Sequence, residues 1–126
     1  MTDIHSQRRT PLARPGGDAD KTRMDEILRV DHAGEYAAVR IYQAQRAVFE
    51  GRKGHAAVAA DLEHMQAQEA AHLARFEGLL NDRRTRPTAM IPVWRVAASA
   101  LGVGTALLGE KAAHACTEAV ESVIEE

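Results

Sequence analysis

The sequence predicts an all-α fold, a bundle of long amphipathic helices. Alanine and the aliphatic residues leucine, valine and isoleucine dominate, aromatic residues make up only 4 % of the chain, and no alternating run typical of a strand occurs. Apolar residues make up 45 % of the chain, which is enough for one core, and 126 residues suit a single domain.

Residues 1–23 are expected to form a disordered arm, and residues 24–126 one helical domain. The arm has no apolar core, so it does not resemble a secretory signal. Its arginines are reminiscent of a transit peptide, but Asp3, Asp18 and Asp20 argue against one.

The first helix is expected from Asp25 to about Phe49. Within it, one set of residues recurs in alternating steps of three and four, the spacing that turns one face of a helix toward a bundle core. This stripe consists of Leu28, Asp31, Glu35, Ala38, Tyr42, Gln45 and Phe49. The basic turn GRKG at 51–54 then ends the helix.

The second helix is expected from about His55 to Leu80 and has a similar stripe. Its members are Val58, Leu62, Met65, Glu69, His72, Phe76 and Leu79. Because the connection between the two helices is short, they should form an antiparallel pair.

Pro87 and Pro92 predict a long crossover, followed by a third helix from about Val93 onward. Between Thr88 and Gly109 the only charge is Arg95, but three glycines and the prolines argue against a membrane span. A buried or membrane-surface helix is the expectation. The helical pattern then continues to Glu126 without a cap, which suggests a chain cut off in mid-helix, with about three helices of a four-helix bundle.

Glu69 and His72 form an E-x-x-H pair on the apolar face of the second helix. A buried carboxylate is costly unless it is paired or bound to metal, and a neighbouring imidazole suits a transition metal. A salt-bridged glutamate and a hydrogen-bonded core histidine are the alternative. Glu35 favours the metal, because di-iron bundles take one glutamate from each of two helices and an E-x-x-H from each of the other two.

Three further positions leave alternatives open. Asp31 either orients a metal-bound histidine or is a solvated acid near a helix start. In the third helix, periodicity does not decide between Glu118 and Glu121, and a solvated charged face explains both.

Four runs resemble, in order and spacing, the demethoxyubiquinone hydroxylase family: RVDHAGEYAAVRIY, QAQEAAHLARF, RPTAMIPVW and ALGVGTALLGEKAAHACTEAVE. They cover nearly everything from about Met24 to Glu126. The resemblance implies a ferritin-like bundle with iron ligands Glu35, Glu69, His72 and Glu121, whereas Glu118 and His114 have no ligand counterpart. The family's second E-x-x-H is missing, so four of six ligands are expected and the bundle should be incomplete.

The resemblance also implies a function. It is that of a di-iron monooxygenase of ubiquinone biosynthesis, with two iron ions per complete site, which uses dioxygen to hydroxylate the ring of a demethoxyubiquinone-type lipid quinone. It implies a peripheral membrane protein on the cytoplasmic face of a bacterial inner membrane, or on the matrix side of the mitochondrial one. An accessory lipid-binding protein is a further implied partner.

Other functions stay open at this point. One is a ferritin- or rubrerythrin-like iron protein, and another is an inactive, non-enzymatic helical module. A homo-oligomer is also expected, since two copies of residues 24–80 would together supply six ligands. Nucleic acid is excluded as a partner, because the net charge is −2 and no basic domain or aromatic row occurs.

Overall fold

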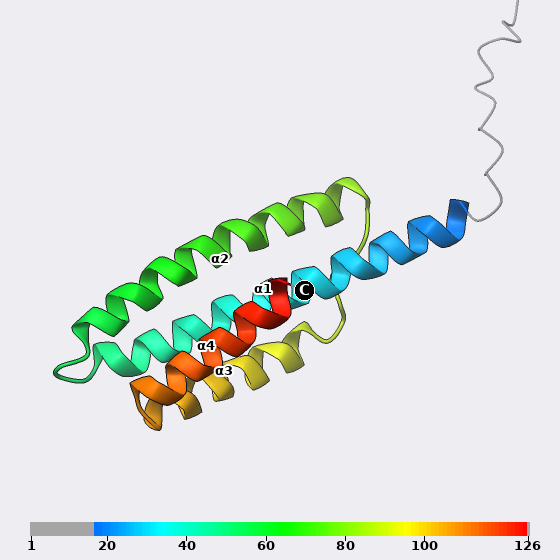
Figure 1. Ribbon diagram of the computed structural model, residues 1–126. Coiled ribbons are helices and arrows are strands. Elements are labelled where there is room, and N and C mark those ends of the chain that lie inside the picture. Colours follow the sequence, from blue (N-terminus) through cyan, green and yellow to red (C-terminus); the bar gives the residue numbers. More distant parts are fainter. Residues whose placement is uncertain (1–16, 126) are drawn as a thin grey trace, which may run out of the picture.

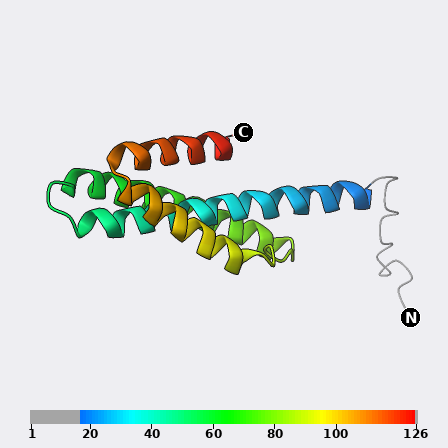
Figure 2. The same ribbon diagram turned by 90° about the horizontal axis from the view of Figure 1, so that it is seen from below.

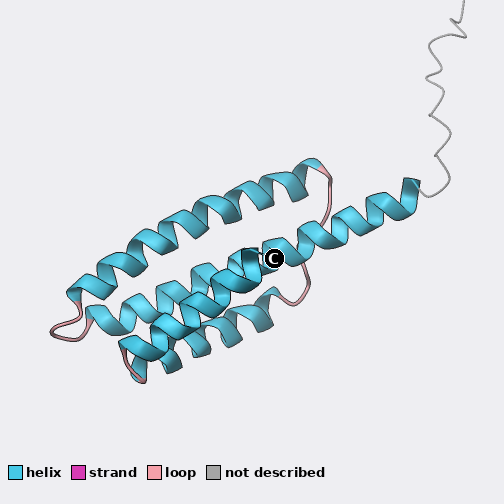
Figure 3. Ribbon diagram, in the orientation of Figure 1, coloured by secondary structure: helices cyan, strands magenta, loops and turns pink. Residues whose placement is uncertain are grey.

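The computed structural model describes residues 17–125, and they form four helices joined by short connections (Figure 1). These helices are α1 (Gly17–Glu50), α2 (Ala56–Asp82), α3 (Ile91–Leu107) and α4 (Glu110–Glu125). Figure 3 shows helix and loop alone over this part of the chain. The all-α prediction is confirmed.

Helix α1 is longer than expected at its N-terminal end. It begins at Gly17, so residues 17–23 are helical and the expectation of a disordered arm is wrong for them. No glycine or proline follows Gly17 in this stretch, and Asp20 provides negative charge near the helix N-terminus, where it is favoured. Residues 1–16 of the expected arm lie outside the described residues.

Helices α1 and α2 form the expected antiparallel pair, connected by a turn that includes Gly54 at φ +86° (Figure 1). Most of the predicted α1 stripe is buried: Glu35, Ala38, Tyr42, Gln45 and Phe49. Asp31 is instead exposed, and its neighbour His32 is buried and faces α2. One turn after Asp31, a Cβ atom added at Gly34 would lie 3.9 Å from Cγ1 of Ile124 near the end of α4.

The α2 stripe is correct at Leu62 and Glu69 but wrong at its far end, where Leu80 is buried and Leu79 is exposed. The predicted stripe repeats every 3.5 residues, whereas a straight helix turns every 3.6, so the stripe drifts off the buried face. Leu80 follows Leu62 by 18 residues, or five turns, and returns to the same face.

The single third helix expected from Val93 onward is two helices. Helix α3 begins at Ile91 with Pro92 in its first turn, where the missing N–H of proline costs nothing. It ends before Gly109, whose φ of +116° suits glycine and breaks the helix. Helix α4 then turns back in the opposite general direction (Figure 2). Residues 17–125 therefore form four helices, where the sequence predicted about three.

The inward face of α3 is built from small residues, Ala98, Gly102 and Ala106, which lie against α1. Its outward face is apolar and exposed, and comprises Val93, Trp94, Val96, Leu101, Val103 and Leu107, with Met90 and Leu108 at the two ends. In the part of the chain that the structure describes, no helix is long and apolar enough to cross a membrane.

Candidate metal centre

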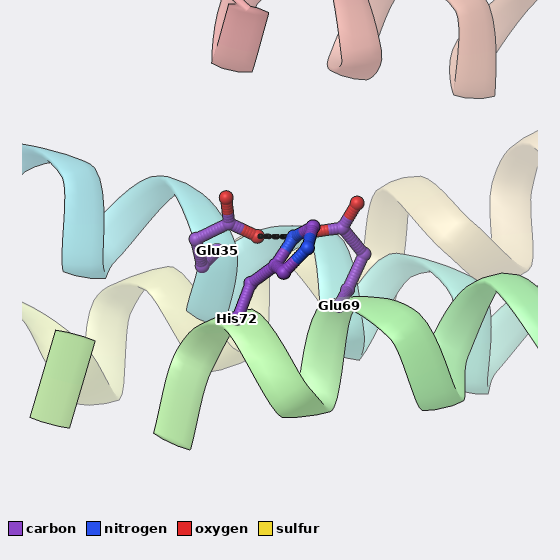
Figure 4. A group of neighbouring side chains, drawn as sticks. All are labelled: Glu35, Glu69 and His72. Atoms are coloured by element: carbon purple, nitrogen blue, oxygen red, sulfur yellow. Dashed lines mark ion pairs between the residues drawn. The ribbon is translucent and has the colours of Figure 1, made fainter. Parts of the chain in front are cut away.

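Three of the four predicted metal ligands meet between α1 and α2. Glu35 lies on α1, and Glu69 and His72 lie one turn apart on α2 (Figure 4). Each offers one potential ligand atom, and these atoms lie within 4.8 Å of one another. The Nδ1 atom of His72 is 3.4 Å from Oε2 of Glu69 and 3.9 Å from Oε2 of Glu35. This geometry fits a small cation held between the two helices.

The two carboxyl groups are buried: Glu35 is 4 % exposed and Glu69 is 5 % exposed. The Oε2 atom of each has no hydrogen-bond partner in the described chain. Burial, and then the neighbouring Glu35 carboxyl, raise the pKa of Glu69 to about 7. Two buried acids in contact are unfavourable unless a proton or a cation lies between them, so this pair is suited to metal.

The side chain of His72 is half exposed, unlike those of the two glutamates. In Figure 4 its ring lies between the two carboxylates, and a dashed line marks its ion pair with Glu35. The group is therefore open to solvent on the side of His72. Two anionic oxygens and one imidazole nitrogen form a donor set that suits iron and related divalent transition metals.

Glu121 on α4 comes close to the same interior. Its Oε1 atom accepts a 2.6 Å hydrogen bond from the hydroxyl group of Tyr42, which is fully buried. Burial raises the pKa of Glu121, the Tyr42 hydrogen bond lowers it, and the adjacent Glu69 raises it again. Glu118 and His114 are both exposed. The structure thus brings Glu121, and not Glu118, beside Glu69, and its role as a ligand stays a prediction.

Two residues of this region were not anticipated. His32 is 3 % exposed, and its Nε2 lies 3.4 Å from Oε1 of Glu77 on α2. The two line a cleft of about 390 Å³ together with Tyr36, Leu80, Asn81, Thr85, Pro87 and Ile91. His32 lies three residues before Glu35, so the two lie on one face of the helix, and this spacing could have identified His32 as buried. The predicted stripe contained Asp31 instead.

Tyr42 is the other unanticipated residue. Its place on the buried stripe was predicted, but its partner on α4 was not. Because a phenol buried in a bundle core needs a hydrogen-bond acceptor, the predicted burial of Tyr42 could have indicated a polar partner on a neighbouring helix.

The family model described as "Ubiquinone biosynthesis protein COQ7" matches residues 22–126. The chain belongs to the COQ7 family. The recognised resemblance and the ferritin-like fold class are therefore confirmed. Within the family, the chain is 54 % identical over 121 residues to a 3-demethoxyubiquinol 3-hydroxylase of Rhodospirillum rubrum, covering 95 % of this chain and 56 % of that protein.

Mitochondrial members of the COQ7 family are also similar. The NADPH-dependent 3-demethoxyubiquinone 3-hydroxylase of Rattus norvegicus is 49 % identical over 105 residues, which are 83 % of this chain and 46 % of the relative. The 5-demethoxyubiquinone hydroxylase of Saccharomyces cerevisiae is 44 % identical over 114 residues, which are 90 % of this chain and 48 % of the relative. The chain spans about half the length of these curated relatives.

Proposed function

We propose that this chain supplies Glu35, Glu69, His72 and Glu121 to a di-iron centre that hydroxylates the ring of a demethoxyubiquinone-type quinone. The observation that carries the proposal is the buried pair of Glu35 and Glu69, whose unsatisfied oxygens face His72. Two such acids in a core are unfavourable unless a proton or a cation lies between them, and a metal ion bound by both would supply the cation. The names of the relatives supply the substrate class.

When bound, two ferrous ions would supply the electrons and the Lewis acidity with which dioxygen delivers one atom to the ring and the other to water. The residues of this chain would bind the two ions and control the access of water to them. Glu35 and Glu69 provide oxygen ligands from two helices, and burial removes competing water from them. His72 adds a nitrogen ligand on the open side of the group, where small molecules have access.

We also propose that α3 attaches the protein peripherally to the membrane that contains the quinone. The exposed half of this helix is apolar, and its one charged residue, Arg95, is drawn toward α1 by a 3.0 Å hydrogen bond from Nε to the hydroxyl of Tyr36. An interfacial helix buries such a face among lipid acyl chains. Such attachment would keep the protein at the membrane in which its lipid-soluble substrate is dissolved.

Membrane attachment can be tested with the natural fluorophore of α3. Trp94 is the single tryptophan of the sequence and is 44 % exposed. On adding phospholipid vesicles its emission should shift to the blue, and a Val96→Glu/Leu101→Glu double variant should show no shift. If wild-type emission is unchanged by vesicles, α3 does not bind lipid and this part of the proposal is wrong.

Several finer points belong to the same proposal. They are attachment to the cytoplasmic face of a bacterial inner membrane, or to the matrix side of the mitochondrial one, an accessory lipid-binding partner, and assembly of more than one copy. The relatives from Rhodospirillum rubrum and from mitochondria are compatible with both locations.

The iron centre is tested by anaerobic loading with Fe²⁺, followed by measurement of iron per chain after desalting. Glu69→Ala should lose the bound iron, whereas Glu63→Ala, which changes an exposed glutamate on the same helix, should keep it. The loaded protein, given a reductant and a short-chain demethoxyubiquinone, should yield the hydroxylated ring by mass spectrometry. Iron that does not depend on Glu69 would leave a COQ7-family helical module without the proposed chemistry.

A further inference from the structure

We propose that Tyr42 is a positioning residue that fixes the orientation of the Glu121 carboxylate toward the candidate metal centre. This inference rests on the proposed function, since it assigns Glu121 a task at that centre. It concerns a side chain that would not itself touch the metal.

Tyr42 lies on α1 two turns beyond Glu35 and has no exposed surface. Its hydroxyl donates the 2.6 Å hydrogen bond to Oε1 of Glu121 on α4. A bond of this length from a hydroxyl to a carboxylate is of the strong, charge-assisted kind. It connects two helices whose residues are 79 positions apart in the sequence.

The phenol is the donor in this contact, because an ionised carboxylate has no proton to give and can only accept. The Oε1 atom of Glu121 is occupied by the phenol proton, which leaves Oε2 to face other partners.

Those partners belong to the candidate metal centre. Glu121 lies on α4 close to Glu69 and His72 of α2. Both residues are members of the group in Figure 4. A bond that fixes one oxygen of Glu121 thus decides where its other oxygen lies relative to that group. Hydrogen bonds to metal-bound carboxylates commonly have this orienting effect.

The position of α4 itself depends on other contacts. Gln45, one turn beyond Tyr42 and also fully buried, donates from Nε2 to Oγ1 of Thr105 at 3.0 Å and to the carbonyl oxygen of Ala113 at 3.4 Å. Ala113 is itself a core residue near the start of α4. Removal of the Tyr42 hydroxyl should therefore leave α4 in place and free only the Glu121 side chain.

The first test needs no metal. A double-mutant cycle compares urea unfolding of wild type, Tyr42→Phe, Glu121→Ala and the double variant. If the bond fixes Glu121, the two changes are non-additive, with a coupling of about tenfold or more in the unfolding equilibrium constant. Additive effects would overturn the proposal, whatever the protein does with metal.

The second test uses Co²⁺, a spectroscopic substitute for Fe²⁺, with affinity measured by calorimetry and coordination by the visible absorption band. Tyr42→Phe should bind Co²⁺ about 10–100-fold more weakly than wild type and with an altered band. The matched control is Tyr36→Phe, which removes the hydroxyl of the other α1 tyrosine, bonded to Arg95 of α3, and should leave both readings unchanged. Circular dichroism confirms that both variants remain helical.

The outcomes separate the two proposals. Coupling in the cycle together with weakened Co²⁺ binding in Tyr42→Phe supports the positioning role. Wild-type affinity and an unaltered band in Tyr42→Phe would overturn it, even if the protein binds metal well. If wild type binds no Co²⁺ or Fe²⁺, the proposed metal centre is wrong, and the cycle alone decides whether Tyr42 fixes Glu121.

Discussion

Gly102 of α3 lies directly against the backbone of Ile41 in α1. A Cβ atom added at Gly102 would stand 2.6 Å from the Ile41 carbonyl oxygen and 2.7 Å from Cβ of Ala44. The α1–α3 interface therefore depends on the absence of a side chain at this position. Since α3 and α4 are consecutive, the same interface also helps to place Glu121.

We expect Gly102→Ala to lower the free energy of unfolding by about 1–3 kcal/mol, because backbone atoms must move apart to admit the methyl group. Gly104→Ala is the matched control on the same helix, where the added methyl meets nothing within 4 Å. That change should stabilise the protein by up to about 1 kcal/mol through helix propensity. Urea unfolding followed by circular dichroism measures both, and equal effects would contradict the close packing.

The stability of the metal-free protein should depend on pH through Glu69. Its pKa is about 7 in the folded state and 4.5 in the reference state, so folding disfavours the ionised form. The Glu69 contribution to stability is therefore full below about pH 4.5 and is lost as the pH rises to about 7. The loss should be on the order of 1–3 kcal/mol.

Other groups titrate over the same range, so the measured quantity is a difference between two proteins. Wild type and Glu69→Gln are unfolded in urea at pH 5 and at pH 7.5. The glutamine variant should gain in stability relative to wild type at the higher pH. A stability difference that is the same at both pH values would show that Glu69 does not titrate in this interval.

The core of the α1–α2 pair could be predicted because periodicity reports which side of a long helix is buried. Glu35, Tyr42 and Glu69 were all placed correctly by that criterion. The errors lie at positions whose burial depends on the arrangement of the neighbouring helices or on the exact helical repeat, which the spacing of apolar residues does not reveal. Asp31 has the right spacing but is exposed. Leu80 is buried instead of Leu79, because a 3.5-residue repeat drifts on a 3.6-residue helix.

The candidate site was predictable in its residues but not in its connections. An E-x-x-H and a glutamate on a second stripe are local features, whereas the choice between Glu118 and Glu121 depended on family resemblance. The Tyr42–Glu121 bond joins residues that only the path of α3 and α4 brings together. That path turns at Gly109, whose positive φ was not anticipated within an otherwise helical pattern.

Arg84 ends α2 in the left-handed region, at φ +53°, where residues other than glycine are disfavoured. The following N–H, of Thr85, donates to the carbonyl oxygen of Leu80 at 2.8 Å, as in a Schellman motif. We expect Arg84→Gly to raise the free energy of unfolding by up to about 1 kcal/mol, since glycine adopts this conformation without steric cost. Arg86→Gly, in the same loop but without a positive φ, should not stabilise, and thermal unfolding compares the two variants. A gain in both would assign the effect to lost charge rather than to backbone conformation.

Metal binding should stabilise the fold through the buried acids. A ligand at about 100 times its dissociation constant adds about 2.7 kcal/mol to the free energy of unfolding, provided that it binds the folded state alone. We expect anaerobic Fe²⁺ to raise the urea midpoint of wild type, and chelation to reverse the gain. Glu35→Gln keeps the shape of the side chain and removes the anion, so Fe²⁺ should no longer shift its midpoint. In the absence of metal, this variant should be at least as stable as wild type near neutral pH, because the repulsion between Glu35 and Glu69 is gone. If Glu35→Gln destabilised the metal-free protein while Fe²⁺ still shifted its midpoint, Glu35 would be a structural residue and the cation would bind elsewhere.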